Sequence, residues 1–158
     1  MPRSRRDLFV GAAAALAPAY LAASAWAERP SLVVYRTRGC ACCPGWVTHL
    51  RQAGFAVRAT DLPRVDSVQR TAGVPPDLAS CYIALLDRFS FSGHVPAAAI
   101  RRFLADPGMW RGLAVPETPP EAPGVEGGTP EAQIYDVYAF DRDGRREPFA
   151  KARGYDLH

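Results

Sequence analysis

The sequence predicts a mixed α/β fold in which strands and helices follow in the order β-α-β-α-β-β-α between residues 32 and 105. Three observations predict it. The apolar, β-branched run at residues 32–35 is typical of a buried strand. A stretch with helical spacing follows it, after a group of three cysteines. Two apolar runs joined by Asp87-Arg88 are typical of a β-hairpin.

The first half of the predicted domain holds two strand–helix pairs. Its expected elements are a strand at residues 32–37, a helix at 44–53, a strand at 55–62 and a short helix at 65–72. In the first helix, Trp46, Val47 and Leu50 recur at helical spacing. Gly54 is the expected stop of that helix, because glycine readily ends helices.

The second half is predicted to be richer in strands. Its expected elements are a hairpin of strands at residues 82–86 and 89–92, a helix at 96–105, a Pro-rich loop at 116–130 and a closing hairpin of strands at 134–140 and 147–150. Pro96 is acceptable there because the first helical turn tolerates proline. The loop shows no periodicity. Asp143-Gly144 is a typical hairpin turn.

The element order, with the cysteine group placed directly after the first strand, is that of a thioredoxin-like fold. The Pro-rich loop and the C-terminal hairpin are then additions to this core. About 130 residues are enough for one domain with its own hydrophobic core. We therefore expect residues 28–158 to form a single domain.

The first 27 residues resemble an export signal. A basic start with Arg5-Arg6 precedes an apolar, Ala-rich stretch at residues 8–23, and Ala25-Trp26-Ala27 fits an A-x-A cleavage site. The paired arginines are typical of twin-arginine signals, although an ordinary secretory signal that holds two arginines gives the same pattern. We expect an exported, periplasmic protein whose mature part spans residues 28–158.

The charge of the mature part argues against polyanionic partners. Residues 28–158 carry 16 basic and 15 acidic side chains and no basic run. This balance gives no electrostatic case for nucleic acid or an anionic membrane surface. The apolar stretch at residues 8–23 is too short and too weakly hydrophobic to favour a membrane span, so none is expected in the mature chain.

Four cysteines dominate the candidate chemistry, and three of them lie in Cys40-Ala41-Cys42-Cys43. The start of a helix favours thiolate over thiol, so we expect reactive thiolates there. Several thiolates with one imidazole suit Cu(I) or Zn(II) and disfavour hard cations. The candidate metal ligands are Cys40, Cys42, Cys43, Cys81 and His94.

Two alternatives use the same cysteines. Cys40 and Cys43 form a C-x-x-C pair in the position of a thioredoxin active site, which predicts a thiol–disulfide oxidoreductase. Arg36 and Arg38 would favour its thiolate, whereas Cys42 would compete for the same partners and leave the activity weak. In the other alternative the cysteines only form disulfides that cross-link a domain that has lost its metal.

Five short motifs occur in an order that resembles the CopG-type family, a periplasmic metal-binding family often found in copper-resistance loci. They are Cys40-Ala41-Cys42-Cys43-Pro44-Gly45-Trp46, Gly73-Val74-Pro75, Ser80-Cys81, Gly93-His94-Val95-Pro96-Ala97-Ala98-Ala99-Ile100 and Gly112-Leu113-Ala114-Val115-Pro116. The resemblance covers nearly all of the mature chain. It implies a thioredoxin-like protein that handles copper through its cysteines, with other periplasmic copper-handling or redox proteins as partners.

The chain departs from the family pattern at three places. The family has Ser-Cys-His where this chain has Ser80-Cys81-Tyr82. It has methionines where this chain has Glu117-Thr118-Pro119 and Pro123-Gly124-Val125. One imidazole and two thioethers are therefore missing. The resemblance still implies metal ligands at Cys40, Cys42, Cys43, Cys81 and His94.

Overall fold

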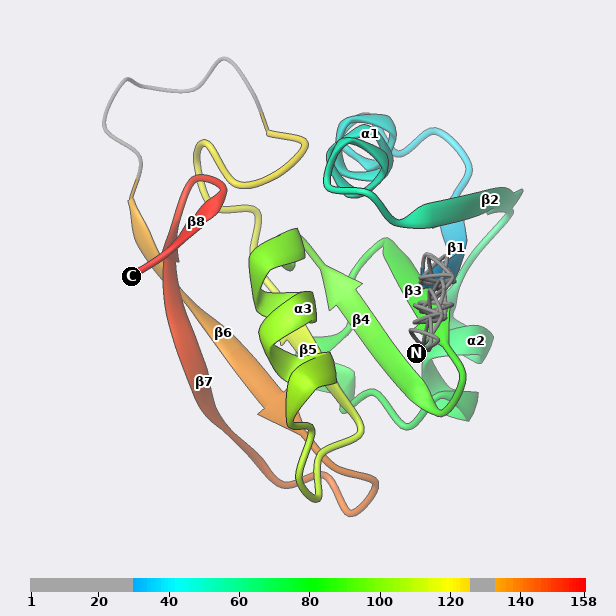
Figure 1. The fold of residues 1–158 in the computed structure, drawn as a ribbon. Helices are drawn as coiled ribbons and strands as arrows, with labels where there is room; N and C mark the ends of the chain where they lie inside the picture. The colour runs from blue at the N-terminus through cyan, green and yellow to red at the C-terminus, as the bar shows by residue number, and fades with distance from the viewer. Residues whose placement is uncertain (1–29, 126–132) are drawn as a thin grey trace, which may run out of the picture.

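One mixed β-sheet is the frame of the part of the chain that the structure describes, residues 30–125 and 133–158 (Figure 1). The structure is a computed structural model. The predicted export signal and residues 126–132 of the Pro-rich loop lie outside the described residues. The strands follow the order β2-β1-β3-β4-β5-β6-β7-β8. Their bounds are β1 Ser31–Thr37, β2 Ala56–Leu62, β3 Tyr82–Leu86, β4 Phe89–Gly93, β5 Gly112–Val115, β6 Ile134–Phe140, β7 Arg146–Arg153 and β8 Asp156–Leu157.

The first four strands follow the predicted element order. β1 pairs in parallel with β2 and antiparallel with β3, and β3 pairs antiparallel with β4. Parallel neighbours need a crossover connection, which here contains the helix α1, Cys43–Gln52. All predicted strands and helices between residues 32 and 105 are confirmed, with ends that agree to within one residue.

Helices cover both faces of the sheet (Figure 1). α1 and α3, Ala97–Ala105, pack on one face, where the buried Trp46 and Phe103 belong to the same hydrophobic cluster. α2, Asp66–Thr71, packs on the other face, where Val68 contacts a second cluster that contains Ile83. Burying side chains of this size contributes about 1.5–3 kcal/mol each. The helices are thus held by their apolar faces.

Residues 112–115 form the strand β5, which sequence reasoning did not predict. β5 pairs in parallel with β4 and antiparallel with β6. Four residues are too few to show a period, so the strand owes its conformation to its two neighbours. Gly112 is required there, because a Cβ at this position would collide with the backbone of Ser90.

The C-terminal hairpin continues the same sheet. β6 agrees with the predicted strand, whereas β7 runs three residues past its predicted end and pairs with the short strand β8. A bulge between Val137 and Tyr138 accommodates Pro148, which cannot donate a ladder hydrogen bond. A 3-10 turn, Pro76–Leu78, was also not predicted. Among the described residues, no helix is long and apolar enough to cross a membrane.

Candidate metal centre

The four cysteines meet where β1 ends and α1 begins. Cys40 lies in the turn after β1, Cys42 is the N-cap of α1, and Cys43 is the first residue of that helix. Cys81 directly precedes β3, and its carbonyl oxygen accepts a hydrogen bond from the backbone N–H of Thr37. Because β1 and β3 are antiparallel neighbours, the end of one and the start of the other lie together. The sheet therefore brings Cys81 to the other three.

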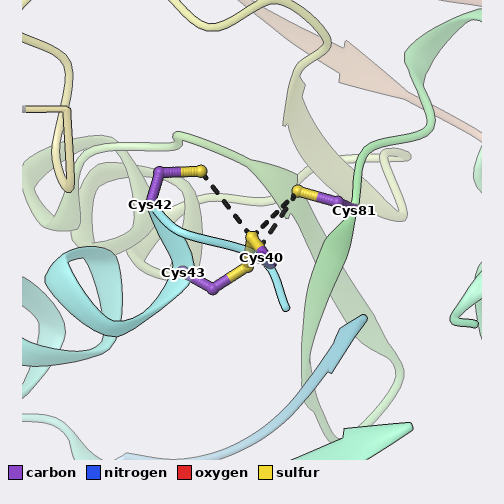
Figure 2. A group of neighbouring side chains, drawn as sticks. All are labelled: Cys40, Cys42, Cys43 and Cys81. Atoms are coloured by element: carbon purple, nitrogen blue, oxygen red, sulfur yellow. Dashed lines mark hydrogen bonds between the residues drawn. A yellow bond between two sulfur atoms is a disulfide. The ribbon is translucent and has the colours of Figure 1, made fainter. Parts of the chain in front are cut away.

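Figure 2 shows the four sulfur atoms facing one another, and all lie within 4.8 Å of each other. Cys40 and Cys43 form a disulfide, whereas Cys42 and Cys81 are free thiols. The Sγ atom of Cys81 lies 3.2 Å from that of Cys40 and 3.9 Å from that of Cys43. The Sγ atoms of Cys42 and Cys40 are 3.7 Å apart. A disulfide sulfur carries no proton, so the two free thiols are the donors in these contacts.

The electrostatic surroundings differ from those expected from the sequence. Cys43 is buried and Cys81 is exposed. Burial, and then the charge of the nearby Cys81, raises the pKa of the Cys42 thiol. At Cys42, burial therefore opposes the thiolate that was expected at the helix start, and a backbone hydrogen bond that lowers the pKa does not offset it. Arg36 forms an ion pair of 2.7 Å with Asp61, so a carboxylate already balances its charge.

Three buried rings lie next to the cysteines. The ring centroids of Trp46 and Tyr82 are 4.8 Å apart, and the ring of His94 meets Tyr82 edge-on at 5.3 Å. The indole N–H of Trp46 donates to the carbonyl oxygen of Val95 at 2.9 Å. Tyr82 directly follows Cys81, and burial, then the charges of nearby cysteines, raises its pKa. The Tyr82 hydroxyl is buried and has no hydrogen-bond partner among the described residues.

His94, a predicted ligand, does not belong to the group of donors that lie within 4.8 Å of one another. Its Nδ1 lies 2.9 Å from the carbonyl oxygen of Pro123. A carbonyl oxygen only accepts, so Nδ1 carries the proton and Nε2 keeps its lone pair. Burial lowers the pKa of His94, which favours this neutral form. Metal-bound histidines are commonly oriented by such a bond to a carbonyl.

The Pro-rich loop packs against the start of α1, a contact that the sequence analysis missed. Gly124 has a φ of +91°, and a Cβ there would lie 2.6 Å from both the carbonyl oxygen of Cys42 and the amide nitrogen of Trp46. The Pro-Gly pair indicates a turn, but nothing in the sequence indicates which element that turn contacts. Of the positions where the family has methionine, residues 117–118 are exposed, and Val125 packs against the core.

The four sulfurs form a soft donor set that contains no carboxylate. Four sulfurs that bind one tetrahedral ion at about 2.3 Å are about 3.8 Å apart. Outside the Cys40–Cys43 disulfide, the closest non-bonded sulfur contacts here are 3.2, 3.7 and 3.9 Å. Thiolates suit Cu(I) and Zn(II) and disfavour magnesium or calcium. The Cys40–Cys43 disulfide withdraws two donors, so the full set requires the reduced protein.

Two solved structures resemble this chain over most of its length. One, described as "Copper resistance protein copG- Form 1", is 32% identical, with a TM-score of 0.73, and the match covers 80% of this chain and all of that one. The chain belongs to the CopG family of copper resistance proteins. The CopG structure described as Form 2 is 33% identical, with a TM-score of 0.72, and the match covers 79% of this chain and 99% of that one.

The family described as "Protein of unknown function, DUF411" matches residues 78–125. No curated protein matches the chain. The resemblance to CopG that was based on five short motifs is confirmed. The mixed α/β fold is thus CopG-like, and it carries a four-cysteine cluster whose donors are suited to a metal.

Proposed function

We propose that this CopG-family protein binds Cu(I) through Cys40, Cys42, Cys43 and Cys81 and serves copper tolerance in the periplasm. One observation carries the proposal: four sulfur atoms converge within 4.8 Å in a chain that is 32% identical to a copper resistance protein. Two of the four thiols are free as they stand. Reduction of the Cys40–Cys43 disulfide, with two electrons and two protons, supplies the other two.

His94 is the candidate fifth ligand, or it positions the cysteines through its contact with Tyr82. Its Nε2 is the nitrogen free to accept, and its ring contacts Tyr82, the residue after Cys81. Zn(II) is the alternative metal, because four thiolates also satisfy its tetrahedral preference. The family favours copper over zinc, and the donor set alone does not distinguish them.

The experiment is an anaerobic Cu(I) titration of the reduced protein against a competing chelator, with Zn(II) titrated in parallel. We expect tight Cu(I) binding that disappears when Cys40, Cys42 and Cys43 are all replaced by serine. Met109→Ala is the matched control, since it removes an exposed sulfur outside the cluster. Undiminished Cu(I) affinity in the triple variant would contradict the assignment of these cysteines as Cu(I) ligands. No Cu(I) binding by the reduced protein would favour the stapled domain that has lost its metal.

The oxidised protein provides a second test. A free-thiol count should give two thiols before reduction and four after it. We expect the oxidised form to bind Cu(I) at least tenfold more weakly, because two of the four sulfurs are withheld. Equal affinity in both forms would show that Cys40 and Cys43 are not ligands.

The disulfide itself supports a second candidate function, thiol–disulfide exchange by a thioredoxin-like core. Within β1–β4 only β3 runs antiparallel to the others, and the C-x-x-C pair follows β1. In the reduced protein, the thiolate of Cys40 would attack a substrate disulfide, and Cys43 would then displace the substrate thiol. Two electrons and two protons pass to the substrate, and the Cys40–Cys43 disulfide re-forms.

Insulin reduction tests this second function. We expect weak turnover, abolished in Cys40→Ser, because Cys42 and Cys81 lie close enough to compete for the mixed disulfide. Turnover at the level of thioredoxin would make exchange the leading function. The partners proposed for either function are other periplasmic copper-handling or redox proteins.

Export by a twin-arginine-like signal is part of the proposal. Fractionation of cells that express the full chain should find the protein in the periplasm. Replacing Arg5 and Arg6 by lysine should retain it in the cytoplasm, while normal export of this variant would indicate an ordinary secretory signal.

A further inference from the structure

A pocket separate from the cysteine cluster lies on the face of the sheet that α2 covers. It has a volume of about 450 Å³ and is bordered by α2 and by the turn between β3 and β4. Leu85, which lines it, pairs with Val33 near the start of β1, whereas Tyr82 pairs with Arg36 near the cysteine end. The pocket therefore lies along the same pair of strands as the cysteine cluster but shares no residue with it.

Two buried polar atoms at this pocket have no partner among the described residues. They are the hydroxyl oxygen of Ser90 and the Nε of Arg111, and both residues line the pocket. Ser90 is only 1% exposed, and its backbone N–H donates to the Arg111 carbonyl, which keeps the two residues adjacent. An unpaired buried polar group costs about 1–3 kcal/mol. Native proteins rarely retain such groups without a ligand, a water or another partner.

The charges around the pocket favour an anion. Arg88 also lines it, and neither Arg88 nor Arg111 forms an ion pair within the described residues. Partial burial, and then the charges of Arg142 and Arg88, lowers the pKa of Arg111. Asp87 is the one acidic residue in the lining. Two arginines and one carboxylate therefore line the pocket, which leaves it with a net positive charge.

The remaining lining is largely apolar. Tyr35, Val68, Ala72, Leu85 and Phe89 contribute to it. The volume lies in the range of about 300–1,000 Å³ that is typical of small-molecule sites. Such sites combine apolar walls with a few placed polar groups. An inorganic anion would leave those walls without a partner.

We propose that this pocket binds a small organic carboxylate, whose oxygens accept hydrogen bonds from the Ser90 hydroxyl and the Arg111 guanidinium. The apolar part of the ligand lies against Val68 and Leu85. A guanidinium presents donors in a fixed fork that matches a carboxylate. The proposal is independent of copper binding, because no cysteine lines the pocket.

The test is a titration of the isotope-labelled protein with benzoate, followed by the NMR shifts of backbone amides. We expect saturable shifts that are concentrated at Val68, Ser90 and Arg111. Benzamide, which has the same shape without the charge, and inorganic phosphate, which lacks the apolar part, should each bind at least tenfold more weakly. If phosphate binds as tightly as benzoate, the ligand needs no apolar part, and the proposal of an organic carboxylate is wrong. If benzamide binds as tightly as benzoate, the ligand needs no negative charge, and the proposal of an anion is wrong.

Variants locate the binding. Arg111→Gln should weaken benzoate at least tenfold and Ser90→Ala about threefold, while the exposed Arg153→Gln should change nothing. Each variant's spectrum reports whether it is folded; if Arg111→Gln is not, the exposed Arg88→Gln, expected to weaken binding about threefold, takes its place. Shifts that do not saturate, that lie at other residues, or that persist unchanged in these variants would refute the proposal.

Discussion

The Sγ atom of Cys81 lies 3.2 Å from the Sγ atom of Cys40, although the two residues are 41 positions apart in the chain. The antiparallel pairing of β1 with β3 creates this contact. Cys81 is the most accessible of the four cysteines, and its neighbour Cys43 is the most buried. The cluster therefore joins one local group of thiols to one thiol from a distant strand.

Cys81→Ser tests how much that distant thiol contributes. We expect Cu(I) affinity of the reduced protein to fall at least tenfold, which corresponds to about 1.4 kcal/mol, because one of four soft donors is lost. Competition with a Cu(I) chelator measures it. Stability should change little, since Cys81 is exposed. Unchanged Cu(I) affinity would place the metal on the helix-start cysteines alone.

Tyr82→Phe should raise stability by about 1 kcal/mol, because it removes a buried hydroxyl that has no partner in the described structure. Thermal unfolding should show an increase of a few degrees, and Cu(I) affinity should not change. If Tyr82→Phe weakens Cu(I) binding as much as Cys81→Ser does, the Tyr82 hydroxyl contributes to Cu(I) binding. Tyr82→His, which restores the family's imidazole, should bind Cu(I) several-fold more tightly.

Gly124→Ala should destabilise the protein and weaken Cu(I) binding. Its Cβ would collide with the backbone of Cys42 and Trp46, which fixes the start of α1. Gly144→Ala is the matched control: Gly144 has a φ of +83° and nothing within 4 Å of a Cβ, so it incurs only the conformational cost of about 1–2 kcal/mol. Urea unfolding of both variants measures the difference. Equal losses of stability in the two variants would show that the Pro-rich loop shifts to accommodate the added Cβ without an energetic cost.

His94 predicts a pH dependence of stability in the reduced, metal-free protein. Its folded-state pKa lies below its ordinary value of 6.5. Below pH 6.5 the unfolded chain therefore binds a proton that the folded protein does not, so stability falls by up to about 1.4 kcal/mol per pH unit. Above pH 6.5 this contribution is constant. Urea unfolding between pH 5 and 8 should show a shallower slope in His94→Gln than in His158→Gln, and identical slopes would contradict the prediction.

Local patterns were sufficient for most of the fold. Trp46, Val47 and Leu50 identified α1 because a helix repeats its buried face within a few residues. β5 was missed because four residues carry no such repeat, and its conformation depends on β4 and β6. Tertiary pairing therefore decided what local sequence could not.

The site was predictable in composition but not in arrangement. The cysteine spacing indicated soft-metal or redox chemistry, and the family motifs added Cys81. The position of Tyr82 between two other buried rings, and the contact of Gly124 with α1, follow only from the folded backbone. Ser90 and Arg111 meet through strand pairing and have no signal in the sequence.

Because Cys81 is far in sequence from the other three cysteines, the oxidation state of the cluster also affects the stability of the domain against unfolding. A cross-link between Cys40 and Cys43 closes a loop of only a few residues and restricts the unfolded chain by about 2 kcal/mol. A metal held jointly by Cys40 and Cys81 closes a loop ten times longer, worth about 4 kcal/mol in the same treatment. A bound metal would then cross-link the end of β1 to the start of β3. Because unfolding separates these two ends, it would also release the metal.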